Sequence, residues 1–177
     1  MGEVAMARSG LRKIIDSAST KEDAVSMLSE RIGFEPESWE NLSETGTKYT
    51  PENIHSLDYN QIFVFGSNLQ GMHLGGAARC AVQNFHAVMG QGVGLQGESY
   101  AIPTMFDTVE EIRPYVDEFL RFAEEHRYLE FYVTKIGCNI AGFKEGDIAP
   151  LFLYALKLKN VILPKSFVEI IEDLYRS

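Results

Sequence analysis

Basic side chains are scarce in this sequence. The chain has 16 lysines and arginines against 25 aspartates and glutamates, which gives a formal net charge of −9 and a pI near 4.9. A surplus of negative charge repels nucleic-acid backbones, and no basic stripe offsets it, so we expect no nucleic-acid partner. A phosphate-bearing small molecule is compatible with this charge, because backbone amides bind phosphate without any lysine.

Cysteines and long apolar runs are also few. The two cysteines, Cys80 and Cys138, favour a reducing compartment without a disulfide framework and leave a single bridge as the open alternative. No apolar run approaches the ~20 residues that cross a bilayer, and the first residues lack the apolar core of a signal peptide. We therefore expect a cytoplasmic protein that does not associate with membranes.

The four histidines are dispersed without the spacing of metal ligands, and we expect no metal and no other cofactor.

Two regions of different composition divide the chain. Residues 1–58 are mostly polar, with two short predicted helices and then a loop rich in Glu, Ser, Thr, Asn and Pro. A docked N-terminal helical appendage is the favoured interpretation. The alternative is an arm that binds a protein partner, because segments of this composition are often loosely held. Residues 59–177 alternate strand and helix patterns and are long enough to form one domain.

The second region opens with a strand followed by a helix. "IFVF" predicts a buried strand. The next helix is expected to run from Gly76 to about Met89, with Val88 or Met89 at the end of its inward stripe. "SYAIPT" predicts another short strand.

The rest of the region continues the same alternation. A helix is expected across "TVEEIRPYVDEFLRFAEEH", opened by a capping box from Thr108 to Glu111. "LEFYVTKIG" predicts a strand, Asp147 is expected to cap a helix that runs to about Leu158, and "NVILP" predicts a closing strand. Strands and helices in this order favour an α/β fold, a three-layer α/β/α sandwich with a mixed sheet. In the helix across "TVEEIRPYVDEFLRFAEEH", the apolar face that should point to the core has five members: Ile112, Val116, Phe119, Leu120 and Ala123.

Glycines gather in two places. Of the fifteen, eight fall between Gly66 and Gly97 and three between Gly137 and Gly146. Each cluster follows a predicted strand, at the position where open α/β sheets bind ligands. Glycines without side chains let backbone amides approach a phosphate closely. Ligand binding is thus the favoured interpretation, with tight packing as the alternative.

The common nucleotide-binding motifs fit poorly. The sequence has no GxxxxGK[ST], and "GQGVGLQG" leads into a strand and does not open a helix. A Rossmann dehydrogenase is therefore not expected.

Three segments fit another family better. In chain order they are "FGSNLQGMHLGGAARCAV", "GVGLQGESYAIPT" and "VTKIGCNIAGFKEGDIAPLF". Across about residues 61–165 the chain resembles the macrodomain superfamily, whose members bind ADP-ribose, and it looks most like a bacterial and phage branch. The resemblance implies a macrodomain-like fold and an ADP-ribose-like small-molecule partner.

The resemblance also implies which residues bind the ligand. Asn68 would contact the distal ribose and is the best candidate for a catalytic residue. A loop that opens the next helix would wrap the diphosphate, and a second loop would close over the phosphates, with Phe143 against the ribose. His73, beside the first loop, either touches the ligand or faces solvent. The expected binding residues are Gly66, Ser67, Asn68, His73, Gly75, Gly76, Ala77, Gly137, Cys138, Asn139, Ile140, Ala141, Gly142 and Phe143.

Departures from the family pattern limit the expected chemistry. The branch that cleaves glutamate-linked ADP-ribose uses a lysine and an aspartate, where this chain has Thr104 or Met105, and Ala141. Cys138 would need a neighbouring base to act as a nucleophile, and a packed small residue is the favoured interpretation. We expect binding of ADP-ribose or a related ADP-ribosyl or nucleotide ligand, with at most weak hydrolysis. The alternatives are a non-catalytic adaptor with a vestigial pocket and another phosphorylated-nucleoside enzyme.

Overall fold

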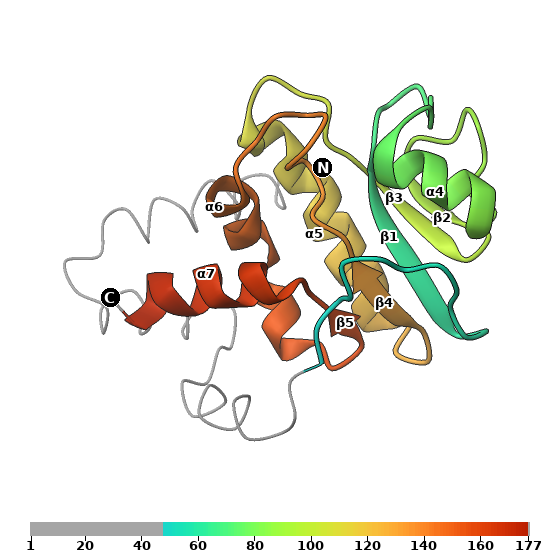
Figure 1. The fold of residues 1–177 in the computed structure, drawn as a ribbon. Coiled ribbons are helices and arrows are strands. Elements are labelled where there is room, and N and C mark those ends of the chain that lie inside the picture. Colours follow the sequence, from blue (N-terminus) through green and yellow to red (C-terminus); the bar gives the residue numbers. More distant parts are fainter. Residues whose placement is uncertain (1–47, 177) are drawn as a thin grey trace. The chain divides into compact units, whose positions relative to one another are not determined.

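The computed structural model describes residues 48–176, of which Lys48–Ile171 form one compact unit. Figure 1 shows the order of its strands and helices. The two predicted N-terminal helices lie outside the described residues. The predicted domain boundary after residue 58 stays a prediction.

Five strands form one mixed sheet in the order β2-β3-β1-β4-β5. Strands β3, β1, β4 and β5 are parallel, and β2 pairs with β3 in the antiparallel direction. The central strand β1 is apolar on both faces because both are covered, as is usual for parallel sheets. The strands are β1 Gln61–Ser67, β2 Gly94–Gln96, β3 Ser99–Pro103, β4 Glu130–Val133 and β5 Val161–Ile162.

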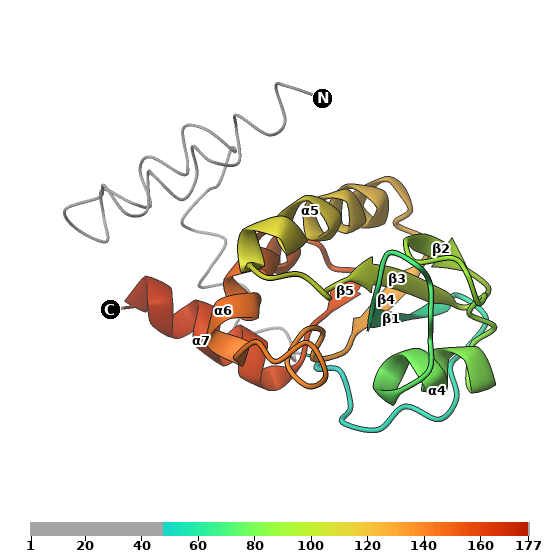
Figure 2. The same ribbon diagram turned by 90° about the horizontal axis from the view of Figure 1, so that it is seen from above.

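Helices cover both faces of the sheet. Figure 2 shows α5 on one face and α4 on the other. The mixed sheet and the four α-helices of the described part confirm the predicted α/β class. None of these helices is long and apolar enough to cross a membrane. The helices are α4 Gly76–Asn84, α5 Val109–Glu125, α6 Glu145–Ile148 and α7 Lys165–Arg176, and a 3₁₀ helix, η1, spans Ala149–Lys157.

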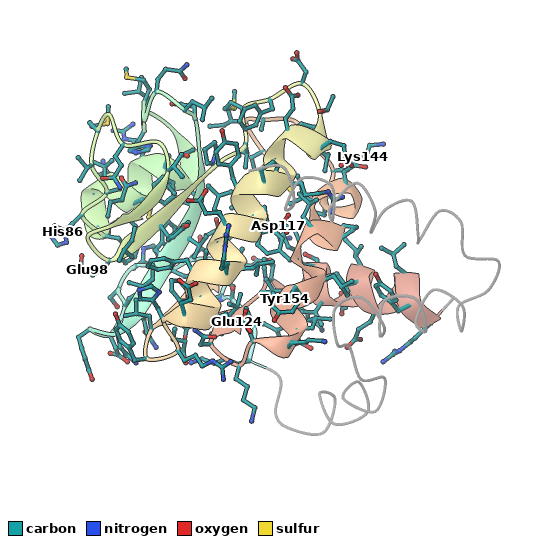
Figure 3. The ribbon with its side chains drawn as sticks, turned by 180° about the vertical axis from the view of Figure 1, so that it is seen from behind. His86, Glu98, Asp117, Glu124, Lys144 and Tyr154 are labelled. Atoms are coloured by element: carbon teal, nitrogen blue, oxygen red, sulfur yellow. The ribbon has the colours of Figure 1, made fainter. Side chains whose placement is uncertain are left out.

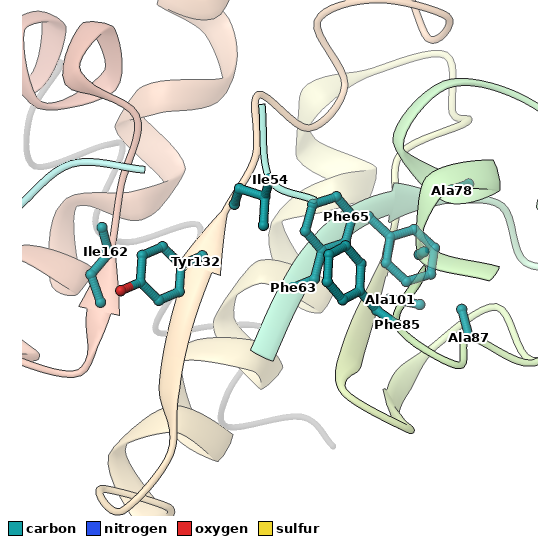
Figure 4. Packing of buried hydrophobic residues seen from close by; sticks show 10 residues of the cluster. Ile54, Phe63, Phe65, Ala78, Phe85, Ala87, Ala101, Tyr132 and Ile162 are labelled. Atoms are coloured by element: carbon teal, nitrogen blue, oxygen red, sulfur yellow. The ribbon is translucent and has the colours of Figure 1, made fainter. Parts of the chain in front are cut away.

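The core has one half on each face, because successive side chains of a strand point to opposite faces. Toward α4, the ring of Phe63 stacks on that of Phe85 with 4.6 Å between centroids, and Figure 4 shows the surrounding cluster. Toward α5, the ring of Tyr100 lies 5.0 Å from that of Phe119. All five residues of the predicted α5 stripe are buried, and the predicted capping box forms.

A polar contact joins η1 to α5. The Tyr154 hydroxyl donates to the Glu124 carboxylate at 2.9 Å, and Figure 3 shows the pair between the two helices. At the far end of the sheet, the carboxylate of Glu98 pairs with the exposed side chain of His86.

The helix after β1 is shorter than predicted. It ends at Asn84 and does not reach Met89. Val88 and Met89 are 50% and 46% exposed, so the expected inward orientation of either one is wrong. The cause is His86, whose φ of +53° lies in the left-handed region that terminates helices.

The predicted helix start at Asp147 is also wrong. The first residue of α6 is Glu145, Lys144 is the N-cap, and Asp147 is the third helical residue. The Asp147 carboxylate still stabilises this start, since it accepts the backbone N–H of Lys144 at 3.2 Å. The α-helical part then ends at Ile148 and continues as η1, where Pro150 has no amide proton to extend the α-helical pattern.

Candidate ligand-binding site

The sheet topology singles out the carboxyl ends of β1 and β4. From β1 the chain leads through α4 toward β3, on one side of the sheet. From β4 it leads through α6 and η1 toward β5, on the other side. Adjacent strands whose connections leave in opposite directions define a topological switch point, and open α/β sheets bind ligands there.

The two glycine clusters meet at this switch point. A Cβ added to Gly66, near the end of β1, would lie 3.4 Å from the backbone nitrogen of Gly137 and 3.0 Å from Thr104 Oγ1. The ends of β1 and β3 and the loop after β4 are therefore neighbours. The two glycine loops, which the resemblance to macrodomains assigns to one ligand, therefore converge at the strand ends. We name residues 68–75 the β1 loop and residues 137–143 the β4 loop.

The β1 loop is held in shape by its own side chains. The side-chain amide of Asn68 accepts the backbone N–H of Met72 at 2.9 Å and donates to the backbone oxygen of Met72 at 3.0 Å. Gly71, inside this turn, has a φ of +66°, which suits glycine. In this structure Asn68 shapes the loop, and contact with a ligand would require it to exchange these two bonds.

Residues 90–92 support the β1 loop from behind. Gly90 N–H donates to Gly71 O at 2.9 Å, and the buried hydroxyl of Ser67 donates to Gly92 O. A Cβ added to Gly92 would lie only 2.2 Å from the backbone oxygen of Asn68. Glycine is therefore needed for the two segments to approach so closely.

His73 is part of this support and is only 2% exposed. Its Nε2 lies 2.9 Å from the backbone oxygen of Gln91, which can only accept, so Nε2 carries the proton. Its ring meets that of Phe65 edge-on at 5.1 Å, and its Nδ1 is buried with no hydrogen-bond partner. The alternative of a solvent-facing His73 is wrong.

The start of α4 presents unpaired amide donors. Gly75 is an extended N-cap without a side-chain capping bond. The first backbone N–H of the helix to find a partner is that of Arg79, which donates to Gly75 O at 3.2 Å. Within the described part of the chain, the amides of Gly76 and Ala77 are thus free for an anion, as is usual at helix N-termini.

The β4 loop presents further donors. Among the described residues, the backbone N–H groups of Gly137, Asn139, Ile140 and Ala141 have no hydrogen-bond partner. The loop is closed by Gly142 N–H, which donates to Asn139 O at 3.1 Å, and Gly142 has a φ of +81°.

One side chain links the two loops. Ile140 Cδ1 lies 3.2 Å from the position that a Cβ on Gly75 would take, and 3.4 Å from that on Gly76. Ile140 is nevertheless 68% exposed. The unpaired amides of both loops thus belong to one surface at the switch point.

Phe143 and Cys138 lie on the inner side of the β4 loop. Phe143 donates its N–H to Gly137 O at 2.9 Å and is half-buried. Cys138 is half-buried too, its thiol donates to Ile136 O at 3.3 Å, and burial raises its pKa to about 11. The thiol therefore stays protonated at neutral pH, which disfavours a nucleophilic role.

Lys135, two residues before the β4 loop, is already paired. Lys135 Nζ lies 2.8 Å from the Glu145 carboxylate. This contact raises the pKa of Lys135 and lowers that of Glu145. An anion at the two loops would therefore be bound by backbone amides and not by this lysine.

The sequence did not assign Thr104 a binding role. It follows β3, is 3% exposed, and donates its backbone N–H to Ser67 O at 2.9 Å. Its place beside Gly66 depends on the pairing of β3 with β1, which no local motif encodes.

Between residues 48 and 176, no three His, Cys, Asp or Glu side chains come together as a metal site. No family model, curated protein or solved structure matches the chain.

Proposed function

We propose that this chain binds ADP-ribose or a related ADP-ribosyl or nucleotide ligand through the β1 and β4 loops. The observation that carries the proposal is the proximity of Gly66 to Gly137, which places the ends of β1 and β4 and their glycine loops together at the switch point of the sheet. The start of α4, directly after the β1 loop, and the β4 loop add backbone donors without partners among the described residues.

A diphosphate suits these donors. The Ile140 side chain of the β4 loop reaches the start of α4, so the amides of both segments lie near one another. Phosphate oxygens accept hydrogen bonds from such amides, and the partial positive charge of a helix N-terminus adds to the attraction. The net charge of −9 does not prevent this, because the attraction is local and needs no lysine.

The proposal also rests on the resemblance to macrodomains in the three quoted segments. In the first and third segments, Gly71 and Gly75 lie in the β1 loop, and Gly137 and Gly142 lie in the β4 loop. A macrodomain-like subclass of the α/β fold, an ADP-ribose-like ligand and a cytoplasmic location are all parts of this proposal.

Hydrolysis of a bound ADP-ribosyl group would be weak. Thr104 is buried, Met105 is 51% exposed, and Ala141 has no polar side-chain atom. None of the three can act as the lysine or the aspartate of the glutamate-specific branch, so no covalent sugar intermediate forms at these positions. Turnover would instead depend on a water held between the sugar and the phosphate. The protein would then only position the water and the sugar and would form no covalent bond to them.

A second candidate is a protein-binding adaptor that uses the same edge of the sheet. Several exposed apolar side chains lie in the two loops and favour it, since exposed apolar side chains that gather mark interaction sites. They are Leu69, Met72, Leu74 and Ile140, each between 49% and 68% exposed.

Thermal unfolding with a nucleotide panel separates the two candidates. A ligand at a hundred times its dissociation constant stabilises the folded state by about 2.7 kcal/mol, so ADP-ribose, ADP or AMP should raise the melting temperature. A parent protein that none of them stabilises would contradict ligand binding and leave the adaptor.

Gly75→Val is the matched variant for this test. Gly75 has a φ of −144°, which any residue adopts, and an added side chain meets only Ile140 Cδ1. We expect the variant to fold and to lose the nucleotide stabilisation. Gly146→Val is the control, because a Cβ at Gly146 meets nothing within 4 Å, and it should retain the stabilisation.

A further inference from the structure

Thr104 has an unpaired hydroxyl at the point where the strand ends meet. Thr104 is 3% exposed, and its Oγ1 has no hydrogen-bond partner among the described residues. Two buried serine hydroxyls near the sheet are paired: Ser67 Oγ donates to Gly92 O, and Ser99 Oγ donates to Gln96 O at 2.7 Å. A hydroxyl without a protein partner can still donate and accept hydrogen bonds, so Thr104 Oγ1 is available to a ligand.

The hydroxyl lies beside Gly66, where the ends of β1 and β3 meet the start of the β4 loop. Oγ1 lies 3.0 Å from the position of the missing Cβ on Gly66, and the backbone nitrogen of Gly137 lies 3.4 Å from the same position. The N–H of Gly137 is also unpaired in the described part of the chain. Thr104 Oγ1 is not among the fully enclosed unpaired atoms there, so this oxygen keeps accessible surface. A hydroxyl and an amide without described partners thus both lie within 3.4 Å of the position of the missing Gly66 Cβ.

The surroundings of this pair are neutral. The next nearest atom to the Gly66 position is Cβ of Ile136, which is buried, as is Ile102 at the end of β3. Lys135 is paired with Glu145. Placing a phosphate charge in such surroundings costs far more than placing a neutral hydroxyl. The charged part of a ligand belongs instead at the more exposed amides of the β4 loop and the α4 start.

We infer that Thr104 Oγ1 and Gly137 N–H form a subsite for a neutral sugar hydroxyl of the bound nucleotide. The inference rests on the proposed function and names Thr104 as a specificity-determining residue. A sugar hydroxyl accepts from Gly137 N–H and donates to Thr104 Oγ1, which satisfies both groups. The hydroxyl belongs either to the ribose next to the base or to a second, terminal sugar.

The test is the affinity of parent, Thr104→Val and Thr104→Ser for ADP-ribose and for ADP, measured by calorimetry. Valine keeps the shape of threonine and removes the hydroxyl, whereas serine keeps the hydroxyl. We expect Thr104→Val to bind ADP-ribose between about twofold and tenfold more weakly, the loss of one neutral hydrogen bond. Thr104→Ser should bind it as the parent does.

ADP distinguishes the two sugars. If Thr104→Val weakens ADP-ribose alone, the hydroxyl is on the terminal sugar. If it weakens ADP by the same factor, the hydroxyl is on the ribose next to the base. If Thr104→Val binds both nucleotides within twofold of the parent, or if Thr104→Ser is as weak as Thr104→Val, the inference is overturned while the proposed function stands. A parent that binds neither nucleotide overturns both.

Stability separates a ligand contact from a structural role. Replacing an unpaired hydroxyl by a methyl group leaves the fold intact, so the melting temperature of Thr104→Val should be unchanged or higher. The control is Thr134→Val, because Thr134 Oγ1 donates to Val64 O at 2.8 Å. The control should melt lower than the parent and keep the parent's ratio of ADP-ribose to ADP affinity. A melting temperature of Thr104→Val as low as that of the control would show a structural role and overturn the inference.

Discussion

At the scale of single residues, Asn68 shows how a loop can be shaped by one side chain. Both ends of its amide are bonded to the backbone of Met72. Asn68→Ala removes both bonds and frees the β1 loop, so we expect weaker binding of ADP-ribose by several-fold, since each bond contributes about 1 kcal/mol. Asn68→Asp is the matched variant, because it keeps the acceptor for Met72 N–H and should lose less. Calorimetry measures both, and equal affinity of parent and Asn68→Ala would contradict this role.

The same variant tests catalysis. We expect slow or absent release of ADP-ribose from glutamate-linked substrates, with any residual activity lower still in Asn68→Ala. Rapid turnover that survives Asn68→Ala would mean that the reaction takes place elsewhere. The assay follows free ADP-ribose from a modified protein.

Cys138 gives a second prediction at this scale. Its pKa is about 11 because burial disfavours the thiolate. In a Cys80→Ala background, alkylation of Cys138 should be slow at pH 8 and rise as the pH approaches 11. The same protein unfolded in urea is the control and should react at the lower pH of a free thiol. Equal alkylation rates at pH 8 in the native and unfolded states would contradict the raised pKa.

At the scale of elements, helix α5 was the most predictable part of the fold. Its apolar residues recur at the spacing of one helix face, and its first turn carries its own capping residues. Both signals are local, so the sequence alone contains them. The short strand β2 and the helix α7 were not predicted. For α7 a usable signal existed, since Phe167, Val168 and Ile171 are buried at helical spacing.

Two variants measure how much each of these α5 signals contributes. Phe119→Ala empties a fully buried site between the sheet and η1, and should lower the free energy of unfolding by about 3–5 kcal/mol. Glu111→Ala removes the carboxylate that accepts Thr108 N–H, and should cost about 1 kcal/mol. Urea denaturation gives both values, and a larger loss in Glu111→Ala would refute the ranking.

A variant can also test the packing of residues 90–92 against the β1 loop. A Cβ in Gly92→Ala would clash with the backbone oxygen of Asn68 at 2.2 Å, so the β1 loop must shift. We expect lower stability and weaker nucleotide binding together, by calorimetry and thermal unfolding. Gly146→Ala is the control, because the added methyl meets nothing within 4 Å. A Gly92→Ala protein that melts and binds as the parent does would show that the contact is unimportant.

At the scale of the whole molecule, the sequence predicted the fold class and the convergence of the loops. It could do so because strand ends in a parallel sheet share one edge, and glycines marked two of those ends. It could not reveal the role of Thr104, whose position beside Gly66 follows from the strand order. It also could not exclude a solvent-facing His73, because the contacts with Gln91 and Phe65 that bury the ring are made between distant segments.

The central claim is that one ligand contacts both loops, and backbone NMR tests it most directly. ADP-ribose is titrated into the labelled full chain while the amide resonances are followed. We predict that the largest shifts occur at Gly76 and Ala77 in one segment and at Gly137 and Ile140 in the other, along a single saturation curve. Shifts confined to one loop, or shifts only at residues remote from both, would contradict the claim.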